Sequence, residues 1–132
     1  EYEHLLLELG KRKSYEPNDE PGYVYVVHGV SGDYTGLFKV GRSRNPRSRF
    51  SALKSTYNTE INPVCTIWTE RHKALEKELH RKFRRIVSVS SGEWFYLQAS
   101  DLRYLRRLSK QSHEYRAKQV FKTVQPLLLA SS

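Results

Sequence analysis

The stretch that decides the fold is YVYVVHGVSGDYTGLFKVG, residues 23–41. Its first five residues, 23–27, are all β-branched or aromatic and therefore predict a strand. Residues 29–36 hold three glycines together with a serine and an aspartate, a composition typical of a hairpin loop. Residues 37–41 then predict the return strand, paired antiparallel with the first.

Alternation along this hairpin places one set of side chains on a common face: Tyr23, Tyr25, Val27, Leu37, Lys39 and Gly41. The intervening Phe38 and Val40 are apolar, so we expect them on the core side. A lysine beside apolar neighbours and other cations has a depressed pKa, which would let Lys39 accept or orient a water proton. The alternative is an ordinary exposed lysine on a strand.

Two further helices and a strand are expected after the hairpin. Asn45-Pro46 predicts a helix start, with Asn as the N-cap and Pro at the first helical position, and this helix should reach about Lys54 with Phe50 and Leu53 inward. Pro63 precedes a third strand at residues 64–68. A helix over residues 70–85 should bury one face at helical spacing, formed by Leu75, Leu79, Phe83 and Ile86.

The two ends of the chain complete the pattern. Residues 90–92 predict a turn, residues 93–97 a short final strand, and Ser100-Asp101 the cap of a helix to about Val124. This helix should turn three leucines inward and seven Lys/Arg outward: Leu102, Leu105 and Leu108 against Arg103, Arg106, Arg107, Lys110, Arg116, Lys118 and Lys122. At the other end we expect a short helix over residues 1–13, with Leu5, Leu6 and Leu9 on one side, and a linker over residues 14–22.

These elements predict a small α/β (α+β) domain, built on an antiparallel sheet of three to four strands and flanked by helices. We expect three segments along the chain. Residues 1–21 form a helical extension and linker, residues 22–98 the main domain, and residues 99–132 a basic helix and tail.

Size and cysteine content limit the class of protein. The chain has 132 residues and a single cysteine, Cys65, so an internal disulfide is excluded and an intracellular protein is expected, in the cytoplasm, the nucleus or a viral replication site. No basic-then-apolar signal sequence opens the chain, and its longest apolar runs are too short to span a bilayer.

The net charge of +9 is unevenly distributed. Residues 1–20 carry six acids and three bases, whereas the remaining 112 residues carry twenty bases and eight acids, a net charge of +12. Because a polyanion releases counterions when a basic surface neutralises it, we expect a nucleic acid partner, in preference to a membrane.

The basic residues are densest between positions 39 and 54, which contain no acid: Lys39, Arg42, Arg44, Arg47, Arg49 and Lys54. The helix N-terminus within this run adds its own positive end, which favours a phosphate-binding surface over a merely solvated face. Arg49 precedes the inward Phe50 and should be held firmly beside the sheet. A fixed guanidinium there suits the charge that develops on a phosphate in a transition state, although a structural ion pair is an equal alternative.

On the helix over residues 70–85, His72, Glu76 and His80 recur every four residues on roughly one face. Three ligands spread over two turns seldom converge on one zinc ion. We therefore favour Glu76 alone as a hard oxygen ligand for Mg²⁺ or Mn²⁺, completed by waters and phosphate oxygens. The alternative is a surface pair of Glu76 with Lys73 or His80.

Taken together, these residues resemble the GIY-YIG nuclease superfamily, particularly its phage and fungal branch that is often labelled DNA-binding. The resemblance covers about residues 22–97 and rests on four motifs that occur in order along the chain. The first three are Tyr23-Val24-Tyr25, Lys39-Val40-Gly41 and Arg49. The fourth is Leu75-Glu76-Lys77-Glu78-Leu79-His80, which is followed by Phe83 and by Gly92-Glu93-Trp94-Phe95. Tyr23 stands where the first motif has glycine, and Lys39 where the second has tyrosine, as in some members. Glu78 competes with Glu76 as metal ligand. The late asparagine of the family has no counterpart, and Glu93 and His80 are the two candidates to replace it.

The resemblance implies a DNA endonuclease that uses a single Mg²⁺ or Mn²⁺ on Glu76. It implies that Tyr25 and Lys39 position and deprotonate the attacking water, and that Arg49 stabilises the charge that develops on the phosphate. Tyr23, His80 and Glu93 are additional candidates for the site. Double-stranded or branched DNA would be held by a basic set: Arg42, Arg44, Arg47, Lys54, Arg81, Arg84 and Arg85. Two alternatives stay open, a binding module that cuts nothing, and a protein-interaction domain whose acidic residues 1–20 fold over the basic face.

Overall fold

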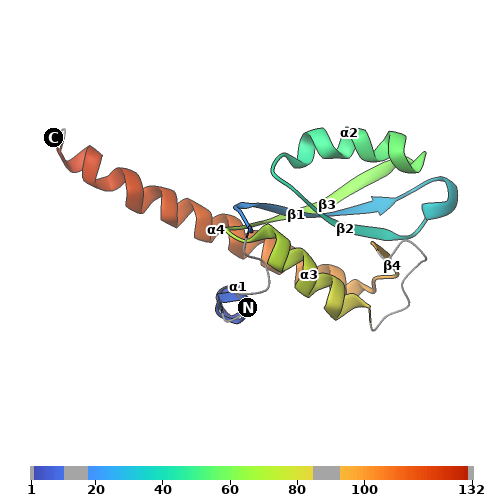
Figure 1. The fold of residues 1–132 in the computed structure, drawn as a ribbon, viewed down its shortest axis with the longest axis horizontal. Helices are drawn as coiled ribbons and strands as arrows, with labels where there is room; N and C mark the ends of the chain where they lie inside the picture. Colours follow the sequence, from blue (N-terminus) through green and yellow to red (C-terminus); the bar gives the residue numbers. More distant parts are fainter. Residues whose placement is uncertain (1, 11–17, 85–92, 131–132) are drawn as a thin grey trace.

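A computed structural model describes residues 2–10, 18–84 and 93–130 (Figure 1). In chain order the elements are α1 (Tyr2–Gly10), β1 (Gly22–Gly29), the short 3₁₀ helix η2 (Gly32–Tyr34), β2 (Phe38–Ser43), α2 (Pro46–Tyr57), β3 (Ile61–Thr69), α3 (His72–Phe83), β4 (Trp94–Phe95) and α4 (Ala99–Ala130).

The four strands form one antiparallel sheet in the order β3-β1-β2-β4. This confirms the α+β class. The β1–β2 hairpin has the expected pairing, with Tyr25 opposite Gly41 and Val27 opposite Lys39. Its loop closes through hydrogen bonds from Gly29 N to Leu37 O and from Gly36 N to Gly29 O.

Helices cover both faces of the sheet (Figure 1). The face of Val24, Val26 and Val40 packs on α1, α3 and α4, in a core that includes Leu75, Leu79, Leu105 and Leu108. The opposite face packs on α2 through a second core: Tyr25, Val27, Leu37, Leu53, Ile61 and Trp94. Lys39 lies in this second layer and is 2% exposed. The alternation predicted for the hairpin is therefore confirmed.

Strand β3 is longer than predicted. It begins before Pro63, so the proline lies inside the strand and does not precede it. The register against β1 shifts between Val26 and Val27, which pair with Cys65 and Pro63. Proline has no backbone N–H to donate to a sheet. It is tolerated here because β3 is an edge strand and because the pairing with β1 is irregular at this point. Strand β4, in contrast, is shorter than the predicted 93–97 and pairs only with Phe38 and Lys39.

The ends of α2 and α4 show how local sequence signals act. The side chain of Asn45 caps α2 by accepting from Ser48 N, and the helix continues past Lys54 until Asn58 adopts the left-handed conformation, at φ 48°. Helix α4 begins at Ala99, before the predicted cap, and Asp101 reaches back to accept from Gln98 N at 2.9 Å. It runs on past Val124, and its last part projects from the body of the molecule (Figure 1).

Several predictions from the sequence fall outside the described residues, namely the first part of the 14–22 linker, the packing of Ile86 and the turn at 90–92. Within the described residues, no helix combines the length and the apolar composition that a bilayer crossing requires.

Helix α3 is capped by a residue distant in sequence. Its own N-cap position, Arg71, makes no side-chain cap. Instead the carboxylate of Asp19 accepts from Lys73 N at 2.8 Å and from Ala74 N at 2.9 Å, and Glu20 O accepts from His72 N. An acid at a helix N-terminus also complements the helix dipole. The end of the predicted linker therefore fixes the start of the helix that carries Glu76.

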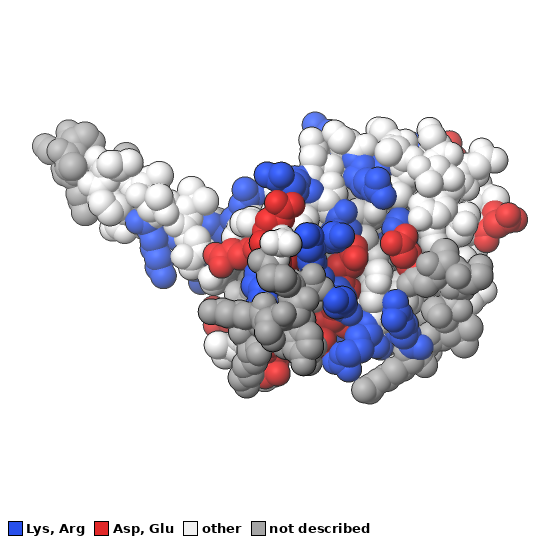
Figure 2. Space-filling model, in the orientation of Figure 1, with Lys and Arg blue, Asp and Glu red and all other residues white. Residues whose placement is uncertain are grey.

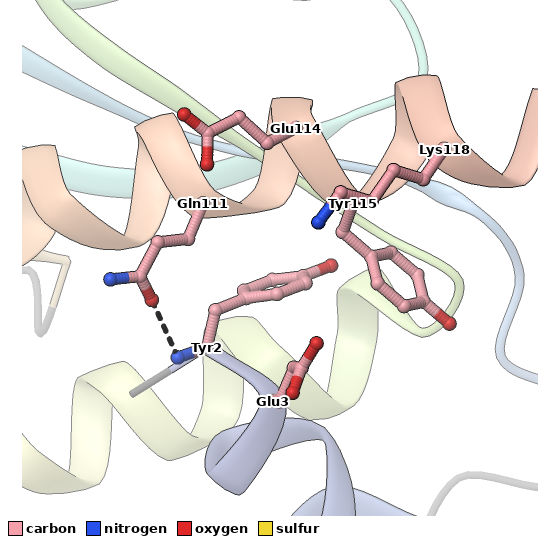
Figure 3. Close-up of a pocket in the computed structure, with 6 residues that line it drawn as sticks. All are labelled: Tyr2, Glu3, Gln111, Glu114, Tyr115 and Lys118. Carbon is pink, nitrogen blue, oxygen red and sulfur yellow. Dashed lines mark hydrogen bonds between the residues drawn. The ribbon is translucent and has the colours of Figure 1, made fainter.

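Helix α1 docks on α4 beside a pocket of about 260 Å³ (Figure 3). Gln111 Oε1 accepts from Tyr2 N at 2.9 Å, and the Tyr2 hydroxyl donates to Trp68 O at 2.6 Å. Leu5 is buried in the core below, whereas the side chain of Leu9 lies outside the described residues. The predicted N-terminal helix thus rests on the same face of the sheet as α3 and α4.

Replacing Asp19 should loosen the start of α3. We expect Asp19→Ala to lower the free energy of unfolding by about 1 kcal/mol, the usual cost of losing an N-cap side chain. Chemical denaturation followed by circular dichroism measures this change. Asp33→Ala, in the exposed η2 turn, is the control and should change stability by less than about 0.5 kcal/mol. Equal losses in the two variants would contradict a capping role for Asp19.

Candidate active site

A polar cavity of about 200 Å³ lies at the edge of β2, close to the point where its pairing with β4 ends. Its walls come from β1, β2, α2, α3 and the residue before β4: Tyr25, Lys39, Gly41, Arg42, Arg49, Glu76 and Glu93. The four residues predicted to act on the phosphodiester, and Glu93 with them, therefore share one cavity. They come from positions up to 68 residues apart in the chain, and only the fold brings them together.

Tyr25 is held between α2 and β2. Its ring is 1% exposed and meets Phe50 edge-on, with the ring centroids 5.5 Å apart. A Cβ atom at position 41 would lie 2.4 Å from the Tyr25 hydroxyl, so only glycine leaves room for the phenol at this point. The space that the Tyr25 hydroxyl needs thus explains why the second motif has glycine at position 41.

Arg49 extends from the first turns of α2 toward Tyr25. A hydrogen bond to the Tyr25 side chain raises the pKa of the Arg49 guanidinium, which stays charged at any relevant pH. The alternative of a structural ion pair is therefore not the main contact of Arg49. Its partner is the phenol, and the guanidinium remains exposed at the rim of the cavity.

The pKa of Lys39 is raised, whereas the sequence predicted a lowered one. Its ammonium lies 2.9 Å from Glu93 Oε2 and 5.8 Å from the ring centroids of Tyr25 and Tyr57. Burial lowers the pKa of Lys39, but Tyr25 and the hydrogen bond and charge of Glu93 outweigh burial, and the net shift is upward. The expectation of a depressed pKa was wrong because it took no account of a carboxylate 54 residues away.

Glu93, the partner of Lys39, is held in place by further hydrogen bonds. Its Oε2 also accepts from the Tyr57 hydroxyl at 3.2 Å, and its carbonyl oxygen accepts from Val40 N at 3.2 Å. Burial raises the pKa of the Glu93 carboxyl, whereas the hydrogen bond and charge of Lys39 lower it, with a net downward shift. Tyr57 was not foreseen, because nothing in its local sequence distinguishes it from any aromatic residue at a helix end.

Glu76 faces the cavity from α3 and is 21% exposed, with Oε1 at 3.8 Å from Arg42 Nε. No group of three His, Cys, Asp or Glu side chains that could hold a metal ion occurs in the described part of the chain. Glu93 is already engaged by Lys39. The donor set therefore fits a hard cation that takes one protein carboxylate and keeps waters and phosphate oxygens, the usual manner of Mg²⁺, and does not fit a cage of protein ligands.

Three other candidates do not line this cavity. Tyr23 points to α4, where Arg116 donates to its hydroxyl. His80 is buried, with Nε2 2.6 Å from Val40 O, and packs on Phe95. His72 lies at the start of α3, 3.5 Å from Glu20. Of the two candidates to replace the family's late asparagine, only Glu93 reaches the cavity.

The predicted nucleic-acid-binding residues are exposed wherever the structure describes them, and Arg85 lies outside the described residues. Figure 2 shows Lys and Arg side chains gathered over the middle of the face that carries α3, with acids among them. Some of these cations have acidic neighbours: Arg44 with Glu20 at 3.8 Å, Lys54 with Glu60 at 3.6 Å and Arg81 with Glu78. The pairs of Arg44 and Lys54 are exposed on both sides, so they are weak and can yield to phosphates.

Comparison with known proteins identifies the domain. A family model described as the T5orf172 domain matches residues 22–111, from the first residue of β1 into α4. This domain is GIY-YIG-like and associated with nucleases. No curated protein and no solved structure matches the chain.

Filling the space at Gly41 should disturb Tyr25. We expect Gly41→Ala to cost about 1–3 kcal/mol of stability, because the added methyl group overlaps the phenol. Chemical denaturation measures this cost, and Ser55→Ala on the exposed side of α2 is the control, with a change below about 0.5 kcal/mol. A Gly41→Ala protein as stable as the wild type would show that Tyr25 is not confined as described.

Proposed function

The chain belongs to the T5orf172 family, and we propose that it is a metal-dependent endonuclease of the GIY-YIG type that hydrolyses phosphodiester bonds in DNA. The observation that carries this proposal is the convergence of a phenol, an ammonium, two guanidinium groups and two carboxylates on a single cavity. Fixed cations aimed at the place where charge develops are the main requirement of phosphoryl transfer.

Glu76 is the residue that would hold Mg²⁺ or Mn²⁺, because its carboxylate faces the cavity from a rigid helix. A divalent ion bound there would polarise the scissile phosphate and stabilise the leaving 3′ oxygen. Arg42, near Glu76, would pair with a phosphate oxygen when DNA enters.

Tyr25 and Lys39 take different parts in this proposal. The raised pKa of Lys39 makes it a permanent cation and leaves proton acceptance to the Tyr25 oxygen. That oxygen is oriented by its hydrogen bond with Arg49. Tyr25 would therefore orient the attacking water and take its proton.

Arg49 would stabilise the negative charge that grows on the phosphate. Its guanidinium is exposed at the cavity, so it can reach a non-bridging oxygen while it keeps contact with the phenol. Hydrolysis of this kind leaves 5′-phosphate and 3′-hydroxyl ends. The exposed Arg44 and Arg47 at the start of α2 would contact the DNA backbone beside the site and fix its register without reading its sequence.

A second function, a DNA-binding module that cuts nothing, is favoured by one observation. Lys39 stands at the tyrosine position of the second motif, and its pairing with Glu93 removes it as a proton acceptor. A site with only one phenol would then depend wholly on Tyr25.

Plasmid nicking with Mg²⁺ or Mn²⁺ separates these two functions. We expect the wild-type chain to nick supercoiled DNA, and Glu76→Ala to slow nicking by more than about 100-fold while DNA affinity is retained, because loss of a Lewis acid removes several kcal/mol of transition-state stabilisation. Glu78→Gln is the matched control, two residues along the same helix and paired with Arg81 away from the cavity.

The outcomes of this assay are distinct. If the wild-type chain binds duplex DNA but never cuts with either metal, the binding module is correct. If Glu76→Ala and Glu78→Gln lose activity equally, the loss reflects the stability of α3 and the role given to Glu76 is wrong.

A further inference from the structure

Glu93 lies where a buried ammonium meets the cavity, and its contacts exceed those of an ordinary surface acid. We propose that Glu93 is a positioning residue of the site, which holds Lys39 at the cavity wall as a fixed cation. The inference rests on the proposed function for its effect on cleavage, whereas the effect on Lys39 itself can be measured without any activity.

Hydrogen bonds hold both the side chain and the backbone of Glu93. Its Oε2 receives two donors, Lys39 Nζ at 2.9 Å and the Tyr57 hydroxyl at 3.2 Å. Its carbonyl oxygen accepts from Val40 N, and the next residue, Trp94, pairs with Lys39 and is fully buried. Trp94 in turn packs against the rings of Tyr34 and Tyr57. A carboxylate anchored in this way can set the position of the ammonium.

Lys39 needs such a partner because of what surrounds it. The titratable and charged groups that line the cavity with it are Tyr25 from β1, Arg42 from β2, Arg49 from α2, Glu76 from α3, and Glu93, and the Tyr57 ring of α2 lies 5.8 Å from its ammonium. Burial disfavours the positive charge of Lys39, whereas Tyr25, Glu93 and Tyr57 favour it, and Glu76 lies beside Arg42 instead. With the lysine almost wholly buried, Glu93 is the carboxylate that offsets the loss of hydration.

The consequence concerns the chemistry of the site. With Glu93 in place, Lys39 keeps its charge through neutral and mildly alkaline pH and contributes to the field around the phosphate. Without that carboxylate, less remains to offset burial, and the ammonium loses its proton more readily. The rate of cleavage should then fall with rising pH in a range where Lys39 of the wild-type chain stays charged.

The first test titrates Lys39 directly. The ¹³Cε signal of Lys39, assigned from its loss in Lys39→Arg, is followed with pH by NMR in the wild-type chain and in Glu93→Gln. We expect the pKa of Lys39 to fall in Glu93→Gln and to stay close to the wild-type value in Glu93→Asp, which keeps the charge. Glu78→Gln, the control on α3, should leave it unchanged.

The second test measures single-turnover nicking across neutral to alkaline pH with Mg²⁺. We expect Glu93→Gln to cut more than about tenfold more slowly with unchanged DNA affinity, and to lose rate further as pH rises, whereas Glu93→Asp recovers part of the rate. A purely structural role would lower the amount of folded protein without moving the pH profile.

An unchanged Lys39 pKa in Glu93→Gln overturns the proposal, and so does a shifted pKa that leaves the nicking profile in place. If Glu93→Gln does not fold, Glu93→Asp decides: a Lys39 pKa close to that of the wild type supports the proposal, and a clearly lowered pKa overturns it. If the wild-type chain cuts no DNA, the proposed function fails, while the NMR titration still decides whether Glu93 controls the charge of Lys39.

Discussion

The pairing register of β1 and β2 is the constraint on which the site depends. Because Tyr25 lies opposite Gly41 and Val27 opposite Lys39, the phenol and the ammonium share the face that α2 covers. A slip of one residue would turn both side chains into the core beneath α3 and α4. The hairpin loop, with its glycines at positive φ at positions 32 and 36, supports the register that both polar groups require.

The remaining parts of the site reach the hairpin from helices whose starts are fixed by polar caps. Asn45 fixes the start of α2 and so the reach of Arg49, and Asp19 fixes the start of α3 and so the position of Glu76. The short β4 begins directly after Glu93, and its pairing with β2 brings Glu93 to Lys39. Polar groups from five parts of the chain thus line one cavity beside β2.

Much of this architecture could be predicted because its signals are local. The hairpin, the cap at Asn45 and the amphipathic face of α3 each follow from residues within a few positions of one another. The resemblance to a nuclease family singled out Tyr25, Lys39, Arg49 and Glu76, and these four residues line one cavity.

What could not be predicted involves contacts between distant residues. The cap that Asp19 gives to α3 spans 54 positions, and so does the pairing of Lys39 with Glu93. The second of these reversed the expected pKa shift of Lys39, because a pattern read along one strand contains no information about a carboxylate that arrives from another element. The proline inside β3 is tolerated for a similar reason, since only the sheet order shows that β3 is an edge.

The central claim is that Arg49 and Glu76 act on the same phosphate, and a double-mutant cycle of single-turnover cleavage rates tests it most directly. If both side chains stabilise one transition state, Arg49→Ala combined with Glu76→Gln should cleave nearly as fast as the slower single variant, because the two effects are not independent. Rates that fall by the product of the two single effects would show that the residues act separately and would contradict the account.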